Sequence, residues 1–166
     1  MSILLGNITA AVNLVETWRK RSLRIVLANG TFDPIHAGHA FYCLGARQYG
    51  DRLIVAVNDD ASVRRLKGPG RPILPIHLRL ASVALLEGVD AVFPFPEDDL
   101  SHVLTVLKPD VHCKGGDYPC PEAIPEYPLA RQLGVESRIV GGPKIQSSSR
   151  ILKTLRKSSC GFSSSD

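Results

Sequence analysis

The sequence predicts an α/β fold in which about five parallel strands form an open, doubly wound sheet with helices on both faces. Short apolar runs of strand length recur along the chain, mostly bounded by Gly, Pro, Asn or Asp. Stretches with helical spacing lie between them, and this alternation implies crossover connections and a parallel sheet. A length of 166 residues, with 44% hydrophobic and 22% charged residues, is typical of one globular domain.

The first predicted element is an amphipathic helix near the start of the chain. Its apolar residues at helical spacing are Ile8, Ala11, Val12, Val15 and Trp18. The basic stretch 19–21 follows, and cations in a last turn complement the helix dipole. We therefore expect this helix to end at the basic stretch.

The remaining elements alternate between buried strands and helices. The predicted strands are residues 24–28, 53–57, 91–95, 110–113 and 135–140. The predicted helices between them are 40–49, 76–86, 100–107 and 126–133. Residues 67–75 read as a mobile loop and 118–128 as an irregular excursion, because both are rich in Gly or Pro.

We expect one domain over residues 1–157 and a flexible, Ser-rich tail over 158–166. The last helix of the domain is expected to begin at the serines 147–149, whose hydroxyls can cap free backbone amides, and to continue through Leu155.

Composition narrows the class of protein. No stretch approaches the roughly 18 apolar residues of a membrane-spanning helix, and residues 3–15 lack the basic start and cleavage site of a signal peptide. The four cysteines show neither a C-x-x-C pair nor the density of a secreted scaffold. We expect a cytoplasmic protein with reduced thiols. A net charge of +4 suits an anionic small molecule, and no basic stripe predicts a nucleic-acid partner.

The densest functional signal is the segment 29–39, which follows the first predicted strand and leads into a helix. Gly30 and Gly38 permit close backbone approach, and the helix start offers free amides to phosphate. His36 and His39 can add hydrogen bonds or positive charge. Spacing alone also permits a polar loop pair or two metal ligands, but the other three histidines are scattered. A phosphate cradle without a Walker lysine is the favoured interpretation.

Residues 30–39 resemble the GxFDxxHxGH signature of the nucleotidyltransferase superfamily related to class I aminoacyl-tRNA synthetases. From about Leu23 to Leu155 the chain is similar to the bacterial D-glycero-β-D-manno-heptose 1-phosphate adenylyltransferases. The segments that carry this likeness are 58–60, 64–72, Arg79, 108–111 and 114–118. The resemblance implies a Rossmann-like fold and a reaction of ATP, with Mg²⁺, and a sugar 1-phosphate that gives an ADP-sugar for lipopolysaccharide and pyrophosphate.

The resemblance also implies roles for individual residues. His36 and His39 would contact the triphosphate and stabilise the transition state. Lys67 would close over the β- and γ-phosphates, and Arg79 would meet a substrate phosphate. For an isolated Lys or Arg, a solvated surface cation is the ordinary alternative. The other residues expected at the nucleotide or acceptor are Gly30, Thr31, Phe32, Asp33, Gly38, Asn58, Gly115, Gly116, Asp117, Ser147, Ser148 and Ser149.

Several of these residues also have simpler interpretations. Asp33 can orient a histidine or Mg²⁺, or it can cap the turn. Phe32 and Asn58 can line the nucleotide pocket, or they can serve in the core and in a turn. Residues 115–117 can approach the ribose or base, or form a tight turn. The serines at 147–149 can bind phosphate or cap a helix.

The chain departs from the heptose enzymes at two places. Thr31 stands where they usually carry Cys or Val, and the serines 147–149 stand where they carry Ser-Thr-Thr. Alternatives are therefore a cytidylyltransferase or adenylyltransferase for a polyol phosphate or another sugar phosphate. A noncatalytic nucleotide-binding module is a more remote alternative, because it should have lost His36, His39 or Lys67. The family often fuses this domain to a sugar kinase, so we expect a separate kinase, and we expect a homodimer.

Overall fold

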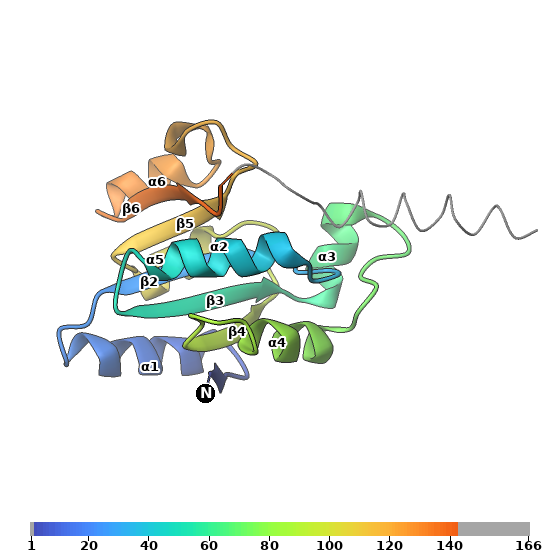
Figure 1. Ribbon diagram of the computed structural model, residues 1–166, viewed down its shortest axis with the longest axis horizontal. Coiled ribbons are helices and arrows are strands. Elements are labelled where there is room, and N and C mark those ends of the chain that lie inside the picture. The colour runs from blue at the N-terminus through green and yellow to red at the C-terminus, as the bar shows by residue number, and fades with distance from the viewer. Residues whose placement is uncertain (1, 143–166) are drawn as a thin grey trace, which may run out of the picture.

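The strands of the structure form one parallel sheet in the order β1-β4-β3-β2-β5-β6 (Figure 1). This computed structural model describes residues 2–142, so the helix and tail expected beyond residue 142 lie outside the described residues. The strands are β1 (Ile3–Leu4), β2 (Ile25–Gly30), β3 (Arg52–Asn58), β4 (Ala91–Phe95), β5 (Val111–Gly115) and β6 (Glu136–Val140).

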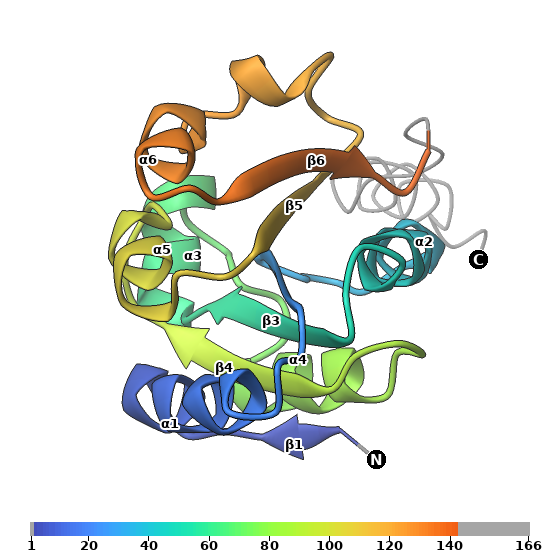
Figure 2. The same cartoon turned by 90° about the vertical axis from the view of Figure 1, so that its left-hand side faces the viewer.

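Helices cover both faces of this sheet. They are α1 (Ile8–Arg19), α2 (Ala37–Arg47), α3 (Asp60–Lys67), α4 (Ile76–Ala84), α5 (Ser101–Leu107) and α6 (Tyr127–Gln132), with a short 3₁₀ turn η1 (Pro121–Ala123). Figure 2 shows α1, α5 and α6 on one face and α2 and α4 on the other. Successive side chains of β2 point to opposite faces of the sheet and join the hydrophobic core on each face. Ile25 and Leu27 pack with α1 and α5, whereas Val26 and Ala28 pack with α2.

The predicted fold class is confirmed, and the bounds of the expected strands and helices within residues 2–142 differ by three residues or fewer. Two elements were not predicted. Strand β1 has only two residues, and its position at the sheet edge depends on backbone contacts such as Ile3 N to Asp90 O, 2.9 Å. Helix α3 buries only Ser62 and Val63, so it has no apolar stripe that sequence periodicity could reveal.

Helix α3 corrects the expected position of Lys67. Asp59 caps the helix by accepting from Ser62 N at 2.7 Å, and Gly68 ends it with a positive φ of 85°. Lys67 is thus the last residue of a helix, and the loop begins after it. The backbone that carries this lysine is more ordered than the predicted loop.

The strand order locates a crevice. From β2 the chain continues to β3 on one side, while β5 lies on the other side of β2. The connections that follow these two strands therefore lead to opposite sides. At this switch point a gap lies at the carboxyl ends of the two central strands, and ligands bind at such gaps in open α/β sheets. The fold therefore directs attention to the residues that follow β2, β3 and β5.

Candidate active site

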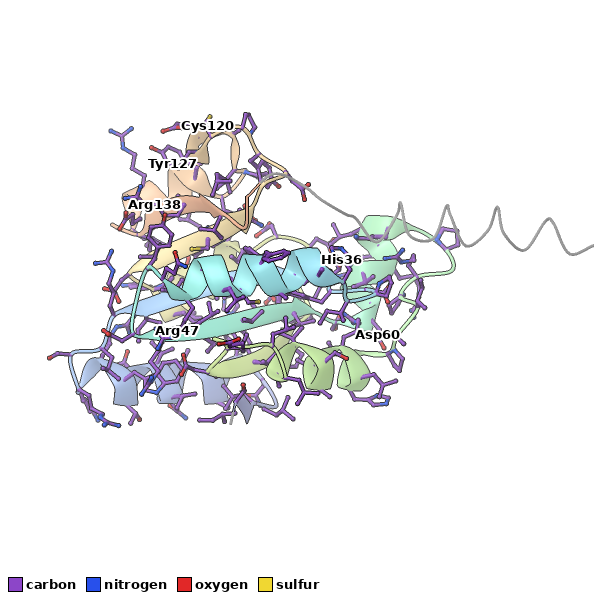
Figure 3. The ribbon with its side chains drawn as sticks, in the orientation of Figure 1. His36, Arg47, Asp60, Cys120, Tyr127 and Arg138 are labelled. Carbon is purple, nitrogen blue, oxygen red and sulfur yellow. The ribbon has the colours of Figure 1, made fainter. Side chains whose placement is uncertain are left out.

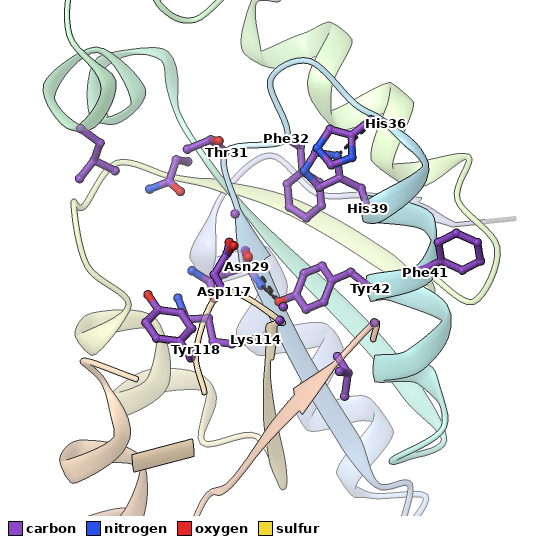
Figure 4. A pocket seen from close by; sticks show the side chains of 18 of the residues that line it. Asn29, Thr31, Phe32, His36, His39, Phe41, Tyr42, Lys114, Asp117 and Tyr118 are labelled. Atoms are coloured by element: carbon purple, nitrogen blue, oxygen red, sulfur yellow. Dashed lines mark hydrogen bonds between the residues drawn. The ribbon is translucent and has the colours of Figure 1, made fainter. Parts of the chain in front are cut away.

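A cavity of about 690 Å³ opens at this crevice (Figure 4), within the usual range for a small-molecule site. Its walls come from the end of β2, the start of α2, the end of α3 and the segment after β5. Most of the residues predicted for the site line this one cavity. They are Gly30, Thr31, Phe32, His36, Gly38, His39, Asn58, Lys67, Gly115, Gly116 and Asp117.

The two histidines are held by the first turn of α2. His36 is its N-cap residue, and the His36 backbone N–H donates to His39 Nδ1 at 3.1 Å. The rings stack with centroids 3.9 Å apart and planes 24° apart. Because Nδ1 of His39 accepts this bond, its neutral ring carries the proton on Nε2. That leaves an N–H donor available at the other side of the ring.

Burial, with the charges of His36 and Lys67, lowers the pKa of His39 to about 3, while Asp117 opposes the shift. The His39 ring is therefore neutral near pH 7. A polyanion bound here would counter the part of this shift that comes from neighbouring positive charge, while the larger effect of burial would remain. The pair is thus suited to meeting negative charge that arrives with a ligand.

The turn between β2 and α2 is shaped around Phe32. This residue has a φ of 49°, in the left-handed region that non-glycine residues rarely adopt. Its ring lies 4.9 Å from that of His39, measured between centroids. A Cβ on Gly30 would stand 3.2 Å from Phe32 Cε2, which is a crowded contact. Gly30 therefore makes room for the ring that supports His39.

Two other lining residues approach from β3 and α3. Asn58 Nδ2 donates to Ser62 Oγ at 2.9 Å and to the Glu97 carbonyl at 3.3 Å, so this amide ties β3 to neighbouring segments. Lys67 projects from the end of α3 and lines the cavity beside Leu66. Of these residues, only Lys67 carries a positive charge, which would attract a phosphate.

The carboxylate of Asp33 binds backbone amides and an arginine. Its side chain is fully buried and accepts from the backbone amides of Ile73 and Leu74, each at 2.8 Å from one carboxylate oxygen. Arg71 Nε lies 2.9 Å from Asp33 Oδ2. The carboxylate does not line the cavity. It anchors the segment after α3, and its hydrogen-bond and ion-pair partners among residues 2–142 are Ile73, Leu74 and Arg71.

Arg79 also lies away from the cavity, in contrast to the expected phosphate contact. Its guanidinium is completely buried and donates to the carbonyls of Leu74 at 2.9 Å, Thr31 at 2.7 Å and Asn58 at 2.7 Å. It also pairs with the Asp60 carboxylate at 2.7 Å. Four of its five N–H donors are thus used internally, which holds together the ends of β2 and β3.

Five further residues line the cavity that the sequence interpretation did not name as site residues: Asn29 on β2, Tyr42 on α2, Lys114 on β5, and Tyr118 and Glu126 after β5. Lys114 Nζ lies 3.3 Å from Glu126 Oε1. The hydroxyl of Tyr42 donates to the Cys113 carbonyl at 2.6 Å and accepts from Asn29 N at 3.1 Å, so it bridges β2 and β5. Position at a strand end was the available signal for Asn29 and Lys114, whereas Tyr42 reads from the sequence only as a core residue of α2.

Ser147, Ser148 and Ser149 lie outside the described residues. Within residues 2–142, no group of three or more His, Cys, Asp or Glu side chains is arranged to hold a metal ion. No helix in that part of the chain is long and apolar enough to cross a membrane. The arrangement offers two histidines, a lysine and free helix-start amides for a phosphorylated ligand.

Comparison with known proteins supports this interpretation. The cytidylyltransferase-like family matches residues 27–166. "Bifunctional protein HldE" of Aeromonas hydrophila is 47% identical over 143 residues, which cover 86% of this chain and 30% of that protein. The protein of the same name from Alkalilimnicola ehrlichii is 59% identical over 113 residues, which cover 68% of this chain and 24% of that protein. The chain thus spans about a third or less of the length of these curated relatives.

Two solved structures are also similar. The lipopolysaccharide core biosynthesis protein from Thermoplasma volcanium aligns with a TM-score of 0.59 and 31% identity, over 70% of this chain and 93% of that one. A pantoate-beta-alanine ligase from Francisella tularensis aligns with a TM-score of 0.59 over 90% of this chain and 69% of that one. At 16% identity the second likeness concerns the fold alone.

Proposed function

The chain belongs to the cytidylyltransferase-like family, and on that premise we propose that it transfers AMP from ATP to a sugar 1-phosphate. The proposed acceptor is D-glycero-β-D-manno-heptose 1-phosphate, and the products are ADP-heptose and pyrophosphate. The identity with the HldE proteins supports this acceptor, as does the lipopolysaccharide core biosynthesis protein among the similar structures. The observation that carries the proposal is the stacked histidine pair beside Lys67 in a cavity at the switch point.

The proposed step is a displacement at the α-phosphorus. An oxygen of the sugar phosphate forms the new bond to this phosphorus, and the bond to the bridging oxygen of the β-phosphate breaks. The acceptor is already an anion near neutral pH, so no side chain has to remove a proton. Catalysis then consists of alignment and of stabilising charge that moves onto pyrophosphate.

Three side chains would stabilise the negative charge that develops on pyrophosphate. His39 Nε2–H and the stacked His36 ring lie at the start of α2, where free backbone amides add further donors. Lys67 would approach from the end of α3 and contact the β- and γ-phosphates. The interactions of these groups would strengthen as negative charge develops on the departing pyrophosphate. They would therefore stabilise the transition state more than they stabilise bound ATP.

Magnesium would arrive with the triphosphate and neutralise part of its charge. Mg²⁺ commonly keeps several waters and takes one or two carboxylates together with substrate phosphates. The described residues fit that pattern, because they form no larger ligand cluster while Asp117 lines the cavity. The carboxylates of Asp98, Asp99, Asp117 and Glu126 line the cavity, and a carboxylate ligand for Mg²⁺ would come from among them.

A pyrophosphate-release assay tests the function. Each of ATP and CTP is combined with D-glycero-β-D-manno-heptose 1-phosphate, another sugar 1-phosphate and a polyol phosphate, with Mg²⁺. The expected result is the fastest release with ATP and the heptose phosphate, together with ADP-heptose as the nucleotide product. ADP and a newly phosphorylated acceptor, without pyrophosphate, would show a kinase and refute the proposal.

The proposed acceptor is a phosphorylated sugar, so a sugar kinase activity would supply it. The relatives are named bifunctional, and more than two thirds of each lies beyond the matched region. A cytoplasmic location and a homodimer remain predictions of this proposal.

A further inference from the structure

We propose that His112 is a positioning residue: it fixes the side-chain amide of Asn29 so that the amide NH₂ group donates a hydrogen bond to a substrate in the cavity. This inference rests on the proposed function, since the substrate is one of the two reactants of the nucleotidyl transfer. It assigns a role to a buried histidine that lies on β5 beneath the site and that the proposed mechanism does not use.

The sheet register brings the two residues together. In the pairing of β2 with β5, Leu27 lies opposite His112, and Asn29 follows two residues later on the same face as Leu27. His112 is fully buried, and its Nε2 lies 3.3 Å from Asn29 Oδ1. The contact therefore joins the two central strands at the switch point where the cavity opens.

The protonation of His112 determines which way the amide faces. Burial, with the charge of Lys114, lowers the pKa of His112 to about 3, so the ring carries one proton near pH 7. His112 Nδ1 is buried without a hydrogen-bond partner among the described residues. A proton at Nδ1 would be an unsatisfied buried donor, whereas a proton at Nε2 is donated to Asn29 Oδ1.

The amide oxygen is thus held by the ring, and the NH₂ group is directed elsewhere. Asn29 lines the cavity, and its Nδ2 has no hydrogen-bond partner among residues 2–142. The backbone of Asn29 is fixed as well, because its N–H donates to the Tyr42 hydroxyl at 3.1 Å (Figure 4). Both the position and the orientation of this donor are therefore set before any ligand binds.

An uncharged amide recognises an acceptor atom without neutralising charge. The ligand atom is a phosphoryl or sugar oxygen or a ring nitrogen, and it belongs either to ATP or to the sugar phosphate. The chemistry is the same for both sources, so the kinetic test measures KM for each substrate separately. The substrate whose KM changes is the one that Asn29 contacts.

The first experiment is a double-mutant cycle with His112→Leu, Asn29→Ala and the combined variant. Each single substitution should raise KM for the same substrate about 5- to 20-fold, with a smaller change in kcat. His112→Leu should add nothing further in the Asn29→Ala background. His112→Gln supplies a donor at the same place and should restore most of the affinity. An unchanged KM in a folded His112→Leu protein, or additive effects in the double variant, would overturn the inference.

A second measurement does not depend on activity or on a variant that folds. Long-range ¹H–¹⁵N spectra of the wild-type protein should show His112 as the neutral tautomer with its proton on Nε2. A proton on Nδ1 would refute the proposed orientation of Asn29. If the wild-type protein releases no pyrophosphate with any substrate pair, the proposed function fails, whereas the tautomer of His112 still decides the positioning role.

Discussion

The residues of the site gain their properties from backbone contacts that the sequence alone does not show. The Nδ1 atom of His39 is occupied by the His36 backbone N–H, which leaves Nε2–H for a ligand. Figure 3 shows His36 at one end of α2 and Arg47 toward the other end, and His36 lines the cavity. The motif spacing predicted that the two histidines act together, but only the helix cap explains which atoms are available.

Replacing either histidine should damage turnover more than folding. We expect His36→Ala and His39→Ala to lower kcat about 100-fold or more, because the rings act on charge that develops in the transition state. Thermal unfolding should shift little, since both rings are only partly buried. His102→Ala is the matched control, because that exposed histidine lies outside the cavity. Near-wild-type kcat in stable variants would remove the histidines from the mechanism.

Replacing Arg79 should damage folding more than turnover. Its buried guanidinium makes four internal hydrogen bonds or ion pairs, so Arg79→Met leaves three carbonyls and the Asp60 carboxylate without their donor. We expect the free energy of unfolding to fall by about 3 kcal/mol or more in urea titrations. Arg64→Ala, an exposed arginine on α3, should change it by less than about 0.5 kcal/mol. A stable Arg79→Met protein with a raised KM would instead support the phosphate contact first expected from the sequence.

At the element scale, the segment that follows α3 is anchored at residues 71–74, and Lys67 is the last residue of the helix before it. Asp33 accepts from the amides of Ile73 and Leu74 and pairs with Arg71. Helix α3 itself is short and exposed, with few buried residues. This combination permits small movements of Lys67 toward a triphosphate while residues 71–74 stay in place.

Weakening the anchor at Asp33 should make residues 71–74 more mobile and lower turnover. Asp33→Asn removes the charge that holds Arg71, so amide exchange at Ile73 and Leu74 should become faster and turnover should fall. Lys67→Ala should lower turnover without faster exchange there, because an exposed lysine contributes little to stability. Lys20→Ala, exposed at the end of α1, is the control for loss of a surface cation. Equal exchange in Asp33→Asn and wild type would show that the carboxylate is dispensable for the anchor.

The elements differ in how far sequence could predict them. The strands 53–57 and 91–95 are continuous apolar runs because helices cover both faces, and periodicity identified them. Helix α3 was missed because its formation depends on the cap at Asp59 and on contacts with Glu97 rather than on an apolar stripe. Lys67 was consequently assigned to a loop.

At the scale of the whole molecule, alternation of strands and helices predicted the parallel sheet, and position at strand ends predicted where the cavity lies. The residues with several internal partners could not be separated from ligand-binding residues in the same way. Asp33 and Arg79 belong to conspicuous motifs, yet each binds backbone atoms of distant segments and one oppositely charged side chain. Only the three-dimensional arrangement distinguishes a buried tie from a substrate contact.

The fold as a whole should lose stability in mild acid because it buries neutral histidines. The pKa of His112 is about 3 in the folded chain, against an ordinary value of 6.5 in the unfolded chain. As pH falls below 6.5, the unfolded chain takes up a proton that the folded chain does not. The stabilisation is therefore fully present above pH 6.5 and declines toward pH 3, and His39 acts in the same direction.

Urea titrations between about pH 7 and pH 4.5 test this dependence, since that range avoids most carboxylate titration. His112 should contribute a slope of up to about 1.4 kcal/mol per pH unit. His112→Gln cannot titrate, so its free energy of unfolding should vary less with pH than that of the wild type, and the two curves should converge as pH falls. His102→Gln is the matched control for the substitution itself, because His102 is exposed and lies outside the core. Parallel curves for His112→Gln and wild type would mean that the buried ring does not stay neutral in the folded protein.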